Sequence, residues 1–250
     1  MAVVAFTDAE ILAGPARLAT VANEVMLHLS VDALDSTVFA SGGWSANAAG
    51  LARSMVSIKG FMDASPAEAG ALGIDDAAWN TLLVGGARQP ATIAVTSADL
   101  APCYIAPARD LAHMVFGKVG ELTPFAAELS GDGKPAKGQM IHPASIVRTV
   151  GGTGSTAILG TVPAGKSLLV ALHAVSVPAT NVLTLTVQQD DNAGFASPVV
   201  TATLGPVSAP TSLLVIVPGP ITPDDRYRLV WTLTGTSLAS RFGVAVGVTP

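Results

Sequence analysis

The chain has 250 residues and a formal net charge of −5, and charged residues make up only 12% of it. Apolar residues make up 50%, whereas disordered chains combine low hydrophobicity with high charge, so the composition excludes intrinsic disorder. The balance of 13 basic against 18 acidic residues argues against a basic nucleic-acid-binding protein, and a single cysteine, Cys103, excludes a disulfide scaffold. Because soluble monomers normally carry charge that keeps them apart, this composition indicates a surface largely buried against other subunits.

The sequence shows no targeting or membrane-spanning segment. Met1–Ile11 lacks a cationic start and contains Asp8 and Glu10, which is not typical of a signal peptide. The longest apolar stretch, Ser167–Val177, contains His173 and is shorter than the roughly 18 residues that a membrane helix needs. We therefore expect no membrane anchor and a protein made in the cytoplasm.

Charge divides the chain into two parts. Residues 1–148 hold 14 acids and 9 bases, whereas residues 149–250 hold 4 of each. The glycine-rich stretch Gly151–Ser155 lies at the change in composition and is typical of a flexible joint. We therefore expect two domains, residues 1–148 and 149–250, each within the usual size range.

The first part is expected to contain strands and a short helix. Apolar and polar residues alternate over Val25–Val31 and again over Met55–Met62, which predicts two half-buried strands. The stretch between them, Ala33–Ala52, is rich in Asp, Ser, Gly and Asn and predicts a long loop, a feature that is usually functional. Asp75 is expected to cap a short helix over residues 76–84.

Further strands follow along the chain. We expect strands over Thr92–Thr96 and Met114–Leu129, the second broken by turns, and a hairpin turn at Gly131-Asp132-Gly133. After residue 148, apolar and polar residues alternate over residues 183–188, 226–233 and 241–248, with a turn cluster such as Gly205-Pro206 between strands. Seven or eight short strands at this spacing predict a sandwich or jelly roll.

One motif has the form of a phosphate-binding loop. Gly160–Ser167 matches the pattern G-x-x-x-x-G-K-[ST], in which backbone N–H groups at the start of a helix hold phosphates. The following residues, Leu168–Val177, are apolar and β-rich, and Pro163 removes one of the N–H donors. We therefore favour a β-turn between two strands over a nucleotide site.

Other reactive residues do not form a recognisable site. The four histidines His28, His113, His142 and His173 lack metal-ligand spacing, and Cys103 has no nearby His or acid in the sequence. The pairs Asp190-Asp191 and Asp224-Asp225 could hold calcium at loop tips, but the Asp-x-Asp-x-Asp-Gly pattern is absent and turn-forming Asp is the commoner role. We expect no cofactor and no enzymatic activity.

The segment Leu27–Trp44, with its Asp35-Ser36-Thr37 and Gly43-Trp44, resembles the tail tube (major tail) proteins of long-tailed bacteriophages. In that family an alternating strand runs into an Asp-x-Thr segment, a Gly-Trp pair, a long loop and a Gly-Leu, which stands here as Gly50-Leu51. Ser54–Asp63 is similar to the strand that follows in the family, and Gly120–Gly133 to its late strand and hairpin. The chain departs from the family at Ser45, where Arg or Lys is common, and in its Ala-rich loop.

The resemblance implies a mainly β fold: a tail-tube-type β-barrel or sandwich with a short flanking helix, plus a C-terminal jelly-roll or Ig-like sandwich. It implies a structural virion protein that forms stacked, hexameric rings around a passage for DNA. Asp35, Thr37, Gly43, Trp44 and Leu51 are then expected in an inter-ring loop. Expected partners are further copies, other tail proteins such as tape measure and terminator, and double-stranded DNA in transit. The expected location is the virion tail, assembled in the host cytoplasm.

The composition agrees with this reading. An anionic subunit gives a ring whose wall does not attract phosphates, because affinity for DNA comes mostly from Lys and Arg. The alternative is a phage decoration or carbohydrate-binding protein that acts through the C-terminal sandwich. Tubes or rings in electron micrographs favour the first reading, and glycan-binding monomers favour the second.

Overall fold

The fold is described from a computed structural model of the chain. It describes residues 8–36, 47–62, 71–73, 75–77, 79, 88–115, 122–236 and 239–250. Nearly all of the regular structure in these ranges is β-strand, and residues 75–77 and 79 are helical. The expected mainly β class is therefore confirmed.

Strands follow one another along the whole described chain. They are β1 (Glu10–Ala13), β2 (Ala16–Arg17), β3 (Ala22–Asp35), β4 (Asn47–Phe61), β5 (Gln89–Ala94), β6 (Ala101–Val115), β7 (Pro124–Gly131), β8 (Ala136–His142), β9 (Val147–Arg148), β10 (Gly152–Ile158), β11 (Ser167–Ser176), β12 (Val182–Asp190), β13 (Val199–Val207), β14 (Thr211–Pro218), β15 (Arg226–Thr234) and β16 (Ser240–Val248).

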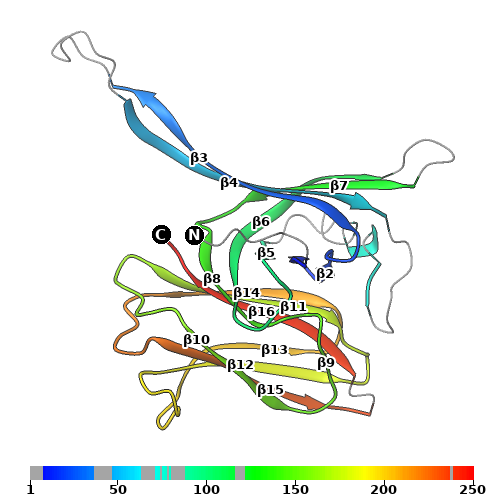
Figure 1. The fold of residues 1–250 in the computed structure, drawn as a ribbon, viewed down its shortest axis with the longest axis vertical. Helices are drawn as coiled ribbons and strands as arrows, with labels where there is room; N and C mark the ends of the chain where they lie inside the picture. Colours follow the sequence, from blue (N-terminus) through cyan, green and yellow to red (C-terminus); the bar gives the residue numbers. More distant parts are fainter. Residues whose placement is uncertain are drawn as a thin grey trace.

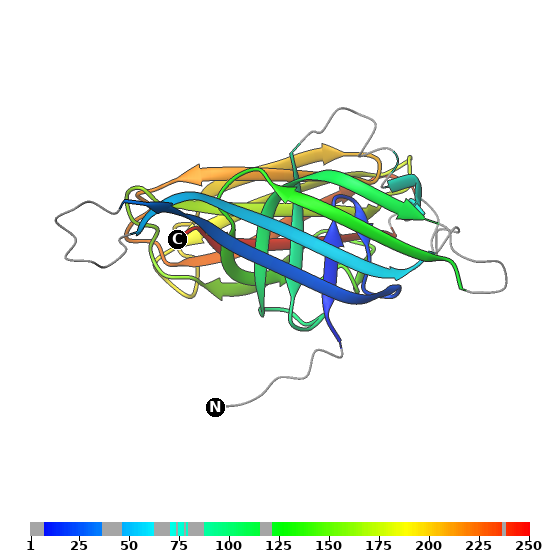
Figure 2. The same ribbon diagram turned by 90° about the horizontal axis from the view of Figure 1, so that it is seen from above.

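These strands form two sheets. The larger has 12 strands, with the path β14-β11-β16-β8-β6-β5-β1-β2 and a branch in which β6 pairs with β7, β7 with β4 and β4 with β3. The smaller has four strands in the order β10-β15-β12-β13. The large sheet curls, so that β3, β4 and β7 lie over β5, while its other end faces the small sheet (Figures 1 and 2).

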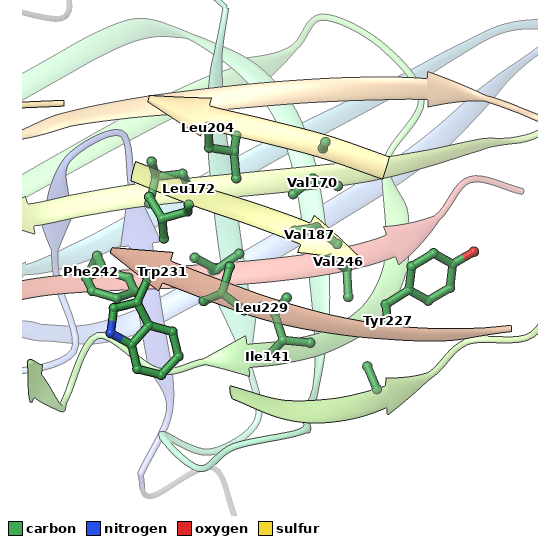
Figure 3. Close-up of a cluster of buried hydrophobic side chains, with 14 of the residues drawn as sticks. Ile141, Val170, Leu172, Val187, Leu204, Tyr227, Leu229, Trp231, Phe242 and Val246 are labelled. Carbon is green, nitrogen blue, oxygen red and sulfur yellow. The ribbon is translucent and has the colours of Figure 1, made fainter. Parts of the chain in front are cut away.

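The small sheet and strands β11, β14 and β16 enclose an apolar core, as a β-sandwich does. Leu172 and Val170 on β11 and Val246 on β16 meet Leu229 and Trp231 on β15 in this core (Figure 3). Alternate residues of each strand point inward, which is why the period-two pattern of the sequence located β12, β15 and β16.

The junction between the two parts of the chain is a continuous sheet. Strand β16 pairs with β8 over Val248↔Lys137 to Val244↔His142, and strands from both sides of position 148 therefore share hydrogen bonds. Gly138 and Gly247 face each other here, and a Cβ at Gly138 would lie 1.9 Å from the carbonyl oxygen of Val246. The division into domains at residue 148 stays a prediction about folding units.

The expected hairpin at Gly131-Asp132-Gly133 is wrong. Strands β7 and β8 do not pair with each other; both pair with β6, β7 through residues 108–115 and β8 through residues 101–105. The Asp132 N–H donates to the Pro107 carbonyl at 2.8 Å, which holds the intervening turn against the middle of β6. Strand β6, most of which the sequence patterns did not reveal, is long enough for two strands to follow one another along it.

The expected flexible joint at Gly151–Ser155 is also wrong, because residues 152–158 form strand β10. Glycine is needed there for close packing: a Cβ at Gly152 would lie 2.7 Å from Cζ2 of Trp231. The expected turn at Gly205-Pro206 falls inside β13, where the pairing with β12 shifts register between Leu183 and Leu185. Glycine-rich composition here reflects packing and bulges, not chain mobility.

The predicted loop Ala33–Ala52 is wrong at both of its ends, which are strand, and its residues 37–46 lie outside the described residues. Strand β3 continues to Asp35 and β4 begins at Asn47, with a register shift between Val31 and Ala33. Small residues such as Ala48 and Ala49 pair here across the hairpin, a contact that local composition does not predict. In the predicted helix over residues 76–84, residues 76, 77 and 79 are helical, and the others lie outside the described residues.

Candidate surface for self-assembly

The most prominent feature outside the core is the long hairpin of β3 and β4. Figure 1 shows these two strands extending well beyond the rest of the fold. Strand β4 pairs with β7 only from Phe61 to Met55, so its remaining residues, 47–54, pair with β3 alone. No strand of the described chain pairs with the outer edge of β3. Such free edges are templates for pairing with another chain.

The hairpin has an inner and an outer face. Val25 and Leu27 on β3 and Val56 and Ile58 on β4 point inward and pack in the core cluster beneath the sheet. Beyond this cluster the cross-strand pairs Leu29↔Ser54 and Val31↔Ala52 continue the inner face with no core beneath Leu29 and Val31, both of which are exposed. The sequence pattern predicts half-buried strands and does not reveal this change along the hairpin.

Large apolar side chains are exposed all along the hairpin. They are Met26, Leu29, Val31, Leu34, Leu51, Met55 and Phe61. A soluble monomer normally avoids a gathering of this kind, and one marks an interaction surface. The hairpin thus combines unpaired backbone with apolar side chains.

Two ion pairs join the strands of the hairpin across its outer face. Arg53 contacts Asp32 at 3.0 Å, and Lys59 contacts Glu24 at 2.8 Å. All four side chains are well exposed, so these pairs contribute little to stability. They neutralise charges on the hairpin, which leaves its surface suited to contact with another apolar surface.

The residues expected in an inter-ring loop map to this hairpin in part. Asp35 is exposed at the end of β3, and Leu51 on β4 is 73% exposed. Thr37, Gly43 and Trp44 lie outside the described residues. The role of all five in contacts between rings stays a prediction.

The motif Gly160–Ser167 is a turn, as its sequence context favours. The Lys166 N–H donates to the Pro163 carbonyl at 3.2 Å, and strand β11 begins at Ser167 where a phosphate-binding loop would start a helix. Val162 pairs with Ile221 on the neighbouring segment. The turn closes one end of the sandwich.

Two of the histidines are buried parts of the structure. His173 Nδ1 donates to the Gly14 carbonyl at 2.7 Å, and its Nε2 accepts from the Thr92 hydroxyl at 2.8 Å. His142 Nδ1 donates to the Phe242 carbonyl at 2.9 Å, and its Nε2 accepts from Arg148 at 2.7 Å. The pKa of each is lowered to about 4, mainly by burial, and at His142 the Arg148 charge is a second cause of the shift.

The remaining candidate groups, the Cys103 thiol and the Asp190 carboxylate, also have roles in the fold. Burial raises the pKa of the Cys103 thiol to about 12, which keeps it protonated and unreactive. Asp190 accepts backbone hydrogen bonds from Asn192 and Ser197, which lower its pKa and shape a loop. In the described ranges, no group of three or more His, Cys, Asp or Glu residues could hold a metal ion. None of the described helical residues belongs to a helix long and apolar enough to cross a membrane.

Comparison with known proteins finds similarity among solved structures. No protein-family model and no curated protein matches the chain. A chain of the virion of a native gene transfer agent particle is 12% identical, with a TM-score of 0.42 over 52% of this chain and 95% of that one. A chain of the SPP1 tail tube is 9% identical, with a TM-score of 0.41 over 55% and 80%.

The Dit protein of phage SPP1, described as a hub of the adsorption apparatus in phages that infect Gram-positive bacteria, is 12% identical. Its TM-score is 0.34, over 97% of this chain and 99% of that one. All three TM-scores are below 0.5.

Proposed function

We propose that the chain is a structural subunit of the tail of a phage-like particle and that it assembles with copies of itself into rings that stack as a tail tube. The observation that carries this proposal is the β3–β4 hairpin, which presents free strand edges and exposed apolar side chains. Closing a ring would pair such edges and bury such side chains. Both free strand edges and exposed apolar side chains promote aggregation of a soluble protein, and ring closure would remove both.

The sequence supports the tail assignment independently. The resemblance to tail tube proteins rests on Leu27–Trp44 and Ser54–Asp63, which form or flank this same hairpin. A subunit charge of −5 with few charged residues suits a protein that contacts neighbours on several sides and lines a passage for DNA without holding it. Tape measure and terminator proteins would then be its partners, in the virion tail.

The proposal is tested by charge substitutions on the hairpin. We expect the double variant Leu34→Glu, Leu51→Glu to stay folded, because both side chains are exposed, and to lose ring or tube formation, because glutamates would repel across the contact. Ile158→Glu is the matched control: Ile158 on β10 is 56% exposed, like Leu34 at 55%, but lies on the small sheet.

Negative-stain electron microscopy shows whether rings or tubes form, and light scattering measures the oligomeric state of each variant. Rings or tubes from the parent and from Ile158→Glu, and monomers from the double variant, would support the proposal. A parent protein that stays monomeric at all concentrations would contradict it, and monomers that bind glycans would favour a decoration or carbohydrate-binding role.

A further inference from the structure

The sheet formed by β3, β4, β7 and residues 108–115 of β6 has one covered face and one bare face. The covered face carries Val56 and Ile58, which pack in the core cluster beneath it, and the sandwich lies beyond that core (Figure 1). The bare face, made by the outward-pointing residues of these four segments, is here named the outer wall. Met26 and Met55 on the outer wall are exposed.

The position of the subunit's bulk decides which face of this sheet a ring would turn inward. The ring would close through free strand edges such as that of β3, so the sheet would form part of the ring's wall, with one face toward the axis. The core and the sandwich all lie on the covered side of the sheet (Figure 1). A closed ring has more room outside than around its axis, so this bulk belongs outside, and the outer wall faces the axis.

Every lysine and arginine that the structure describes on the outer wall is paired with an acid. The pairs are Lys59 with Glu24 at 2.8 Å, Arg53 with Asp32 at 3.0 Å and Arg109 with Asp132 at 2.8 Å. Asp132 also lies 3.1 Å from Arg88. Glu128, exposed on the same face, has no ion pair among the described residues. The described part of the outer wall therefore carries acids without a base but no base without an acid.

This pairing determines how the outer wall meets a polyanion. Affinity for DNA comes mostly from Lys and Arg side chains that neutralise phosphates and release counterions. A base that already holds a carboxylate must give up that contact before it can neutralise a phosphate. Met26 and Met55, which lie between the ion pairs, have no N–H or O–H to donate. The outer wall is therefore poor at holding DNA although it contains three basic residues.

We propose that the outer wall lines the passage for DNA and that Glu24 and Asp32 keep Lys59 and Arg53 from binding the phosphates. The inference rests on the proposed ring. It gives these ion pairs a role other than stability, to which such exposed pairs contribute little. Loss of one acid would free a cation on every subunit, and the freed cation would repeat around and along the tube.

The variant Glu24→Gln tests this role. It is expected to fold and to form tubes as the parent does, because the ion pair that it breaks is exposed. Assembled tubes are mixed with a short labelled DNA duplex and sedimented, and the duplex in the pellet is measured. At about 50 mM salt we expect at least about tenfold more duplex with the variant than with parent tubes, and at about 200 mM salt most of this excess should be lost.

Asp225→Asn is the matched control. It changes the net charge by the same amount and breaks the ion pair of Asp225 with Arg226, 3.7 Å apart at the small sheet. Because a confined passage focuses the field of the charges that line it and an outside surface does not, tubes of this control should retain no more duplex than parent tubes. The double variant Glu24→Gln, Lys59→Gln should also return to the parent level, because it removes the freed cation.

The outcomes separate this inference from the proposed tail function. If tubes of Glu24→Gln retain no more duplex than tubes of the parent or of Asp225→Asn, the inference is overturned and the tail function stands, since tubes have formed. Excess duplex that persists in the double variant would overturn the role given to Lys59. A parent protein that forms neither rings nor tubes would contradict the tail function, and the inference would fall with it.

Discussion

Single buried residues hold together the two parts of the chain. His173 on β11 bonds to Gly14 and Thr92 in the first part, and His142 on β8 bonds to Phe242 on β16. Both rings must be neutral: each Nδ1 faces a carbonyl and so carries the proton, whereas each Nε2 accepts from a donor. A second proton on Nε2 of His142 would face the Arg148 donor and break that bond, and one on Nε2 of His173 would require the Thr92 hydroxyl to turn from donor to acceptor.

Stability is therefore expected to fall in mild acid. The pKa of each histidine is about 4 when folded and about 6.5 when unfolded, so the unfolded chain takes up protons first as the pH falls. The contribution is complete above pH 6.5 and is lost as the pH falls toward 4. Between pH 7 and pH 5 we expect each histidine to lower the free energy of unfolding by about 2 kcal/mol.

Urea denaturation at pH 7, 6 and 5 measures this loss, and NMR titration of the imidazole signals of His142 and His173 assigns it. A free energy of unfolding that stays level over this range would contradict the expectation. Imidazole signals that titrate near pH 6.5 in the folded protein would do so as well.

Gly138 is a position where the addition of a single carbon atom is expected to change the stability of the fold. A methyl group there would meet the backbone of Val246, which cannot move aside as a side chain can, so Gly138→Ala is expected to destabilise the fold by about 1–3 kcal/mol. Gly194→Ala is the control, because its Cβ would meet only Asn192 Oδ1 at 3.4 Å, and a change within about 0.5 kcal/mol is expected. Thermal denaturation compares the two, and equal midpoints would contradict the expectation.

At the scale of elements, the hairpin of β3 and β4 separates folding from assembly. Its inner residues up to Leu27 and Val56 pack in the core, whereas the part beyond them contacts no core cluster. Removing the outer part should therefore leave the subunit intact.

The test replaces residues 32–51 with Asn-Gly, which closes the pair Val31↔Ala52 with a tight turn. This deletion removes Asp35, Thr37, Gly43, Trp44 and Leu51 together. We expect a folded subunit with a thermal midpoint within about 5 °C of the parent, and no stacking of rings in electron micrographs. Unimpaired tube growth would show that these five residues have no role between rings.

At the scale of the whole molecule, the large sheet crosses the expected domain boundary. One buried cluster joins Leu12, Ile105 and Met140 from the first part to Leu169 and Ala245 from the second. A fragment of residues 1–148 would lose β16 and β11, expose the edge of β8 and uncover this cluster. A free strand edge and an exposed apolar cluster are recognised causes of aggregation.

We therefore expect the fragment 1–148 to be insoluble or to unfold without a cooperative transition. Circular dichroism during heating shows whether the soluble part of the fragment unfolds cooperatively, with the full chain as reference. A soluble fragment with a sharp transition would establish residues 1–148 as an independent domain, and would leave 149–250 as an addition to it.

The sequence by itself determined the β class and the places of many strands. Alternation of apolar and polar residues is a local property, and it identified the cores of β3, β4, β12, β15 and β16. The same local reasoning correctly interpreted residues 160–167 as a turn, because an apolar β-rich run follows them.

Only the tertiary structure decided how the strands pair. Gly138 faces Gly247 across more than a hundred residues, and β7 and β8 share β6 although only a short turn separates them. Such partners depend on which edges remain free once the chain has folded, and no local pattern encodes that. The free edge of β4 over residues 47–54 arises from the same choice of partners.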